Sequence, residues 1–246
     1  MPSSAASPSQ PYTGLVEQDG PAEVREVPGL RITKVCTPPF TNNCYLLRCT
    51  TPGPTEGDTL LVDAAGNAPR LLELLGDGRL VGIFQTHGHW DHQQALAEVV
   101  AATGAPVLAH AGDAADLPVP VDRLLADGDE VTVGACTLTV RHLVGHTPGS
   151  LALVYRGDPE RAHVFVGDSL FPGGIGNTEK DPVRFTALLD DVEAKLFGVL
   201  PDQTWVYAGH GGDTTLGAER PALAEDRKST RLNSSHSVTS RMPSSA

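Results

Sequence analysis

Apolar residues fall into short runs separated by Gly, Pro, Asn and Asp, a pattern that predicts alternating strands and helices. Short runs rich in Val, Leu and Ile predict strands at 30–36, 43–49, 58–63, 80–86, 106–110, 150–157, 163–171 and 203–210, with a hairpin at 130–144. Helical spacing predicts helices over 67–78, about 93–103 and 181–200. The last helix has Pro182 in its first turn and one apolar stripe, formed by Phe185, Leu188, Leu189, Val192 and Leu196.

The order of these elements predicts an α/β protein built in layers. Strands occur in both halves of the chain with helices between them, which suits two sheets packed face to face with helices outside. The 246 residues suffice for a full hydrophobic core. Because no change of composition separates two domains, residues 21–225 are predicted to form one domain, after a flexible N-terminus at 1–20.

Charge and cysteine spacing restrict the class of protein. The net charge of −12 argues against a nucleic acid or an anionic membrane as partner. The first residues lack the features of a secretory signal, and no apolar run has the length of a membrane span. The four cysteines show no paired spacing, which favours buried thiols in a cytoplasmic protein. The oligomeric state stays open.

The segment 226–246 differs from the rest of the chain. It is rich in Ser and Arg, lacks apolar periodicity and ends by repeating the opening MPSSA. Such composition predicts a disordered tail. The segment also resembles a translated sequencing adapter, and on that hypothesis it is not native. Native residues would then be lost beyond 225, and an exposed apolar patch is expected around 216–223.

Candidate chemistry is concentrated in residues 85–94, QTHGHWDHQQ, which contain His87, His89, Asp91 and His92. Imidazole and carboxylate are ligands that suit zinc and neighbouring metals. Other residues of these types follow predicted strands directly, each after a glycine: His146, Asp168 and His210. Since functional residues of α/β sheets gather at strand ends, the pattern predicts a metal site.

The motifs THGHWDH, GHTPGS, FVGDSLF and YAGHGGD, with NNCYLL and LVDAAG before them, resemble the metallo-β-lactamase superfamily, in its glyoxalase II-like branch. The resemblance covers about residues 30–220. It implies an αββα sandwich of two mixed sheets with helices outside, and two divalent metal ions, zinc first and iron as the alternative. By position, the first metal would take His87, His89 and His146, and the second Asp91, His92 and His210, with Asp168 bridging both.

Further residues are candidates for supporting roles. Asp63 would orient a ligand histidine or, equally, cap a turn. In the loop 172–181, Asn177 and Lys180 are candidates to contact a thiol carrier, with an ordinary surface loop as the alternative. Trp90 is expected to line the cleft.

The other histidines are not expected to bind metal. His110 and His142 are interpreted as structural, although His142 is near enough to His146 in sequence to line the site. His163 is expected to be an exposed strand residue.

The resemblance implies a hydrolase in which metal-bound hydroxide, held in line by Asp91, attacks a substrate carbonyl. A thiolate leaves without an acid catalyst, so a small-molecule thioester is the favoured substrate, and lactones stay open. Glyoxalase II proper has a C-terminal domain that helps to bind glutathione. Here only residues 211–225 lie between His210 and the tail, which leaves the thiol carrier open.

Other functions are weighed against the hydrolase. The main rival is a persulfide dioxygenase with one iron held by His87, His146 and Asp168. A flavin-linked di-iron enzyme would carry Glu at position 89, and the acidic charge disfavours an RNA-processing nuclease. A non-catalytic metal-binding module would lack some of the ligands, and none is missing here.

Overall fold

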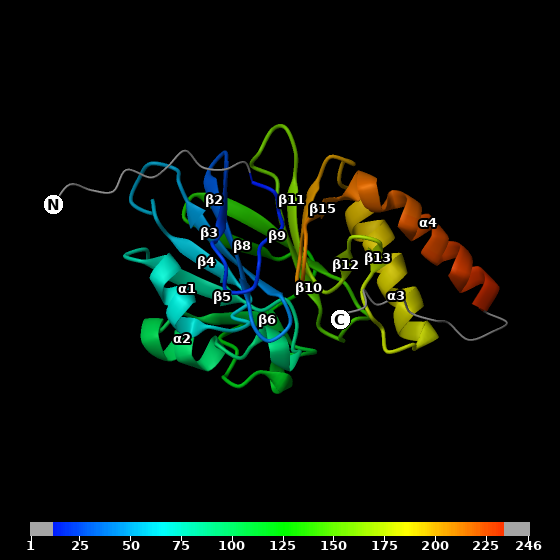
Figure 1. The fold of residues 1–246 in the computed structure, drawn as a ribbon, viewed down its shortest axis with the longest axis horizontal. Coiled ribbons are helices and arrows are strands. Elements are labelled where there is room, and N and C mark those ends of the chain that lie inside the picture. Colours follow the sequence, from blue (N-terminus) through cyan, green and yellow to red (C-terminus); the bar gives the residue numbers. More distant parts are fainter. Residues whose placement is uncertain (1–11, 234–246) are drawn as a thin grey trace.

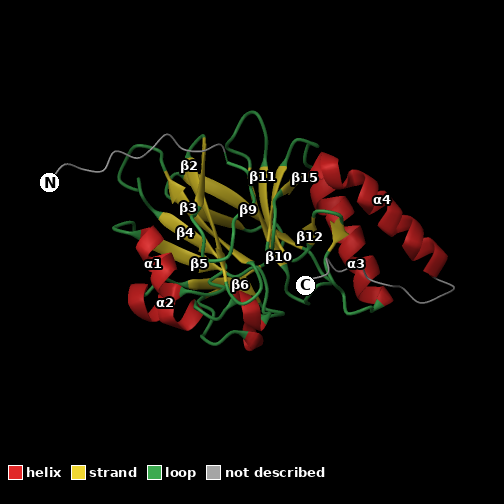
Figure 2. Ribbon diagram, viewed as in Figure 1, coloured by secondary structure: helices red, strands yellow, loops and turns green. Residues whose placement is uncertain are grey.

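The computed structural model describes residues 12–233, and within this range the strands form two large mixed sheets (Figures 1 and 2). The first sheet has the order β1 (Glu23–Val27), β2 (Leu30–Thr37), β3 (Asn42–Cys49), β4 (Thr59–Val62), β5 (Leu80–Phe84), β6 (Val107–His110) and β7 (Arg123–Leu125). The strands from β1 to β4 pair antiparallel, and those from β4 to β7 pair parallel.

The second sheet has the order β15 (Thr214–Thr215), β14 (Trp205–Ala208), β11 (His163–Gly167), β10 (Leu151–Tyr155), β9 (Cys136–His142) and β8 (Glu130–Val133). Here β11 and β14 are parallel, and the other pairs are antiparallel. A small ribbon, β12 (Leu170–Phe171) with β13 (Gly174–Ile175), follows β11.

The helices lie on the outer faces of the two sheets (Figure 2). They are α1 (Ala68–Leu75), α2 (Leu96–Thr103), α3 (Pro182–Val192), which continues as one π turn (Glu193–Phe197), and α4 (Leu216–Asn233), with short 3₁₀ turns at Trp90–His92 and Ala114–Asp116. Local sequence sets their starts: the side chain of Asn67 accepts from the Arg70 amide, and that of Asp181 accepts from Val183 and Arg184.

Three separate apolar cores hold these layers together. Between the sheets lie Leu47, Phe84, Leu138, Phe165 and Tyr207 among others. A second core joins α1 and α2 to the first sheet, through residues such as Leu71, Leu96 and Ile83. A third joins α3 and α4 to the second sheet, and it contains the whole predicted stripe of the helix at 181–200. Two sheets with a helical layer on each side confirm the predicted αββα fold.

Parallel pairing brings the functional strand ends to one edge. In the first sheet β4 and β5 run parallel, so Asp63 and the segment that starts at His87 leave the same edge. In the second sheet β11 and β14 run parallel, which places Asp168 and His210 beside each other. Backbone hydrogen bonds join the two sheets here, from the Leu151 amide to the Thr86 carbonyl (2.7 Å) and from Asn43 to Gly209 (2.8 Å).

Two expectations about burial are corrected by the structure. His163 is buried rather than exposed, because its ring is held between the Tyr207 hydroxyl (3.0 Å) and the Asp158 carboxylate (3.1 Å). The apolar patch expected around 216–223 is not exposed either. Leu216 and Leu223 are buried in the core beneath α4, because the helix lays its apolar side against α3 and the second sheet.

The helix α4 runs through Asn233, past the boundary predicted at 226. Arg227 forms ion pairs with Asp190 (2.6 Å) and Glu193 (2.5 Å) at the end of α3, a long-range contact that composition does not reveal. Residues 226–233 are therefore helical, not disordered as expected, and 234–246 lie outside the described residues, as do 1–11. The hypothesis that the segment is non-native stays a prediction.

All four cysteines are free and buried, as predicted. Among the described helices, none is both long enough and apolar enough to cross a membrane.

Candidate metal centre

Three of the predicted ligands, His87, His89 and His146, come together as one group, here called the first half of the centre. Their ligand atoms all lie within 4.8 Å of one another. His146 Nε2 is 2.9 Å from His89 Nδ1, and the ring of His87 stands edge-on to both other rings. His87 and His146 come from the loops that follow β5 and β9, so this half spans both sheets.

Asp91, His92 and His210 form a second group, called the second half, with ligand atoms also within 4.8 Å of one another. The Nε2 atoms of His92 and His210 face each other at 3.0 Å. Asp91 Oδ2 lies 3.4 Å from His210 Nε2. His92 is fully buried, whereas Asp91 and His210 are half-buried.

Asp168 lies between the two halves. Its Oδ2 is 3.6 Å from His146 Nε2 in the first half and 3.4 Å from His210 Nε2 in the second, and its Oδ1 is 3.4 Å from His92 Nε2. A Cβ atom on Gly209 would stand 2.1 Å from Asp168 Oδ1, so only glycine allows the His210 loop to approach this carboxylate. The structure thus brings all seven predicted ligands together.

These residues fit a metal ion in their charge and in the atoms they leave unpaired. Among the described residues, His87 Nε2 and Asp168 Oδ1 are buried without a hydrogen-bond partner, and such orphaned atoms are costly. Imidazole nitrogens also face one another at hydrogen-bond distance in each half. A cation between them would satisfy the lone pairs, and imidazole with carboxylate is a donor set for zinc or iron.

The two halves differ in the protonation state that they favour for their histidines. Burial lowers the pKa of His146, and burial together with the neighbouring His92 lowers that of His87 well below its usual range. In the second half burial acts in the same direction but is outweighed. Hydrogen bonds to Asp168 and Asp91 raise the pKa of His210 to about 9, and Asp168 and Asp63 raise that of His92.

The carboxylates stay ionised in this setting. Burial disfavours the charged form of Asp168, but His92 and His210 hold its pKa well below the usual range. The pKa of Asp91 is likewise lowered, against the effect of burial, by His210 and His92 and by a hydrogen bond from Asn42 Nδ2 (2.9 Å). The two carboxylates would therefore supply negative charge to a cation bound among these imidazoles.

Each of four ligand histidines has its second ring nitrogen held by a neighbour. The partners are Thr86 Oγ1 for His87 (2.9 Å), Asp63 Oδ2 for His92 (3.0 Å), the Asn177 carbonyl for His146 (2.7 Å) and the Phe40 carbonyl for His210 (2.6 Å). Such partners fix the ring orientation and the tautomer of a ligand. For Asp63 this geometry supports the orienting role over the turn-capping role.

Of the two predicted substrate residues, Asn177 is the one that contacts the first half. The Asn177 carbonyl holds His146, but its side chain accepts from the Glu179 amide, so it stabilises the loop 172–181. Lys180 is exposed on the same loop. Trp90 is 58% exposed and packs edge-on against Phe40, with ring centroids 5.7 Å apart, beside the second half.

His110 and His142 stack on each other, with ring centroids 3.9 Å apart, and belong to neither half. Sequence reasoning missed Asn42, which bonds Asp91, and the carbonyls of Phe40 and Asn177. The Asn-Asn pair that begins β3 is a signal for the first, whereas a backbone carbonyl leaves no sequence signal.

The family follows from comparison with known proteins. A sequence model of the metallo-beta-lactamase superfamily matches residues 37–210. The chain belongs to the metallo-beta-lactamase superfamily. This confirms the predicted family, and the span ends on His210, the last ligand in the sequence.

Relatives of known sequence support the glyoxalase II-like branch. The chain is 42% identical over 171 residues to a hydroxyacylglutathione hydrolase of Fuscovulum blasticum, an alignment covering 69% of this chain and 63% of that protein. The chain thus spans less than two thirds of that relative's length. It is 32% identical to an uncharacterized protein of Mycobacterium tuberculosis (strain H37Rv) over 205 residues, which covers 72% of this chain and 89% of that protein.

Solved structures agree with this fold. The BLEG-1 B3 metallo-beta-lactamase matches with a TM-score of 0.69 and 28% identity over 77% of this chain and 96% of that one. TTHA1623 in a di-iron-bound form matches with a TM-score of 0.62 and 33% identity, over 76% of this chain and 96% of that one. ETHE1 from Myxococcus xanthus matches with a TM-score of 0.69 and 26% identity, over 82% of this chain and 86% of that one.

Proposed function

We propose that the protein is a metal-dependent hydrolase that cleaves a small-molecule thioester with the help of two divalent cations. The observation that carries this proposal is Asp168, whose oxygens lie within 3.6 Å of ligand nitrogens in both halves. The relatives named hydroxyacylglutathione hydrolase support the same reaction. His87, His89 and His146 would hold one cation, and Asp91, His92 and His210 the other, with Asp168 between them.

Cations bound there would supply a water molecule that ionises near pH 7 and a Lewis acid for the substrate carbonyl. The chain's own residues position the reactants. Asp91 is ionised and accepts from Asn42, so its carboxylate can also accept a hydrogen bond from the attacking water and hold it in line. The leaving thiolate has a pKa of about 8.5 in solution and departs without a proton donor.

The surroundings of the centre support a small substrate with two unlike ends. Phe40 and Trp90 present exposed aromatic surface beside the second half, and Lys180 presents a cation on the loop next to the first half. In this proposal Lys180 contacts a polar or anionic thiol carrier, and the aromatic pair lines the cleft. Asn177 contributes through its carbonyl, which holds His146. A cytoplasmic location belongs to the same proposal.

Zinc is the first candidate for the metal. Iron is the second, because TTHA1623, at 33% identity, has been solved in a di-iron-bound form. Iron would also serve the rival reaction, in which a persulfide dioxygenase uses a single iron at His87, His146 and Asp168. The relatives named hydroxyacylglutathione hydrolase favour the hydrolase over this rival.

The test compares two metals and two substrates. We expect zinc-loaded protein to hydrolyse S-lactoylglutathione or a simple acyl thioester, and metal-free protein to be inactive until zinc returns. Asp122→Asn serves as the control, because Asp122 is exposed and holds only the Val107 amide (2.8 Å) among the described contacts. Oxygen uptake by iron-loaded protein with glutathione persulfide, without any thioester hydrolysis, would replace the hydrolase by the dioxygenase.

A further inference from the structure

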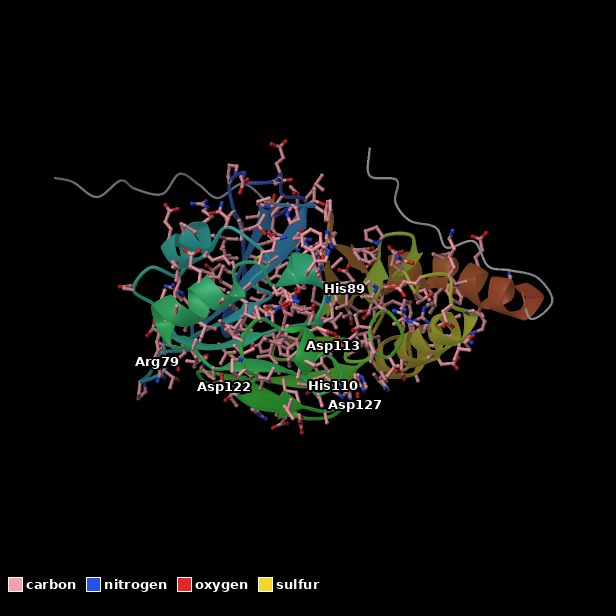
Figure 3. All side chains as sticks on the ribbon, turned by 90° about the horizontal axis from the view of Figure 1, so that it is seen from below. Arg79, His89, His110, Asp113, Asp122 and Asp127 are labelled. Carbon is pink, nitrogen blue, oxygen red and sulfur yellow. The ribbon has the colours of Figure 1, made fainter. Side chains whose placement is uncertain are left out.

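Asp113 is a buried carboxylate, only 1% exposed, that none of the proposed chemistry uses. It follows β6 and precedes the 3₁₀ turn Ala114–Asp116, so it comes from neither of the loops that carry the first half. Figure 3 shows Asp113 between His89 and His110, with Asp122 set apart from them. Burying a carboxylate costs folding free energy unless its oxygens accept hydrogen bonds, so the role of Asp113 depends on its hydrogen-bond partners.

Its hydrogen bonds join the two ligand loops of the first half. Asp113 Oδ2 accepts from the Gly88 amide (2.9 Å), and Gly88 lies between His87 and His89. The same oxygen accepts from Thr147 Oγ1 (2.5 Å), directly after His146. Asp113 Oδ1 accepts from the Gly149 amide (2.7 Å) in the second loop. One carboxylate thus holds both loops at once.

The packing around Asp113 is as tight as the hydrogen bonding. A Cβ atom on Gly149 would stand 2.7 Å from Asp113 Cγ, and one on Gly88 would stand 3.1 Å from Asp113 Cβ, so both loops rest on this side chain. Gln93 completes the support, because its Nε2 donates to the Gly88 carbonyl (2.7 Å) and to the Asp116 carbonyl (3.0 Å). Gly88 is therefore fixed through both its amide and its carbonyl.

We propose that Asp113 is the positioning residue of the first half: it sets the spacing between the His87–His89 segment and His146. It touches none of these three rings and acts through the backbone on either side of them. Carboxylates that orient metal ligands typically contribute 10- to 100-fold to metal affinity. The inference rests on the proposed metal centre but not on the reaction, because its test measures binding of Zn²⁺ alone.

Asp113→Asn is the sharpest substitution. The amide has nearly the same shape but offers one acceptor oxygen, so its NH₂ group must face either the Gly88 amide or the Gly149 amide, and that bond is lost. Zn²⁺ affinity is measured in metal-free protein by competition with a chromophoric chelator, in two backgrounds. His210→Ala leaves the first half complete, and His89→Ala leaves the second half complete.

We expect Asp113→Asn to weaken Zn²⁺ binding about 10- to 100-fold in the His210→Ala background and less than about threefold in the His89→Ala background. Asp122→Asn, the matched control, should change neither. Equal weakening in both backgrounds would show a general structural role and overturn the proposal, as would unchanged affinity in both.

A second pair of variants keeps the proposal testable if Asp113→Asn folds poorly. Thr147→Val removes the hydroxyl that donates to Asp113 at 2.5 Å, whereas Thr147→Ser keeps it. We expect Thr147→Val to weaken Zn²⁺ binding in the first half several-fold and Thr147→Ser to restore it. If Ser and Val bind Zn²⁺ equally, the hydrogen bond to Asp113 does not position the loop.

Discussion

The two halves of the metal centre share Asp168 but are held in different electrostatic states. In the first half, burial keeps His87 and His146 neutral, and the second ring nitrogen of His146 bonds a backbone carbonyl. In the second half, carboxylates raise the pKa of His92 and His210 above the usual range. The first half is thus ready for a cation at neutral pH, whereas the second must release protons to bind one.

The supports behind the two halves differ as well. The first rests on a single carboxylate, Asp113, that bonds backbone amides. The second is supported from the other sheet by Lys34, which is fully buried in β2 and donates to the Gly211 carbonyl (2.8 Å), next to His210, and to Asp213 (2.7 Å). The two halves therefore rest on different buried charged groups, Asp113 and Lys34.

The largest effect is expected from Asp168, which belongs to both halves. Asp168→Asn keeps the shape but removes the charge that faces His146 and His210. We expect the rate of thioester hydrolysis to fall at least about 100-fold and both metals to bind more weakly, because the residue contacts both sites. Loss of only one metal, with the other bound as tightly as before, would show that Asp168 serves one half alone.

Lys34→Met should disturb the support of the second half most strongly. It leaves the Asp213 carboxylate buried without its cation, although Tyr12 and Trp205 still donate to it, and removing one partner of a buried pair costs about 3–5 kcal/mol of unfolding free energy. Chemical denaturation measures this loss of unfolding free energy. Arg31→Met is the control, because Arg31 lies on the same strand as Lys34 and its pair with Glu26 of β1 is exposed, so that pair is expected to contribute less than about 1 kcal/mol. Similar losses for both variants would contradict a special role for the buried pair.

Asp63→Asn should act most strongly on the second half, because Asp63 bonds a ligand ring directly only there. Asp63 Oδ2 bonds His92 Nδ1, and its other contacts are the amide and the hydroxyl of Thr86. We expect Zn²⁺ affinity to fall about 10- to 100-fold in the His89→Ala background, which keeps the second half. In the His210→Ala background the change should be smaller, because Asp63 reaches the first half only through Thr86, which holds His87. An equal change in both backgrounds would contradict the direct role at His92.

The smallest expected effect is a difference in proton release. In metal-free protein the pKa of His210 is about 9, so this ring carries a proton at pH 7 that a metal must displace. The Zn²⁺ affinity of the second half therefore falls as the pH falls below about 9, by up to about tenfold per pH unit for each proton that must be displaced. The lowered pKa values of His87 and His146 leave the first half without this dependence down to at least pH 7.

The difference in proton release between the two halves is measured by adding Zn²⁺ in weak buffer and following a pH indicator. We expect the His89→Ala protein, with only the second half intact, to release about one to two protons more per Zn²⁺ than the His210→Ala protein, from His210 and His92. Equal release from both would mean that the halves do not differ in charge.

The candidate ligands stand out in the sequence because they follow apolar strands in short, dense motifs such as THGHWDH, and the structure brings them together. Their supports were not. Lys34 looks like an exposed strand residue, and its partner Asp213 is 179 positions away in the chain. Asp113 lies in a loop without a motif, and its bonds to Gly88 and Gly149 exist only once β6 stands beside the other strands. The helix at 226–233 was missed for the same reason, since Arg227 pairs with α3.

The central claim is that the seven ligands form one centre for two cations. Metal-free protein reconstituted with Zn²⁺, freed of excess metal and analysed for metal and protein content, tests it most directly. The proposed centre binds two Zn²⁺ per chain, and Asp168→Asn lowers this number. One tightly bound ion per chain, unaffected by loss of His210, would contradict a two-metal centre and leave His87, His146 and Asp168 as the site of a single metal.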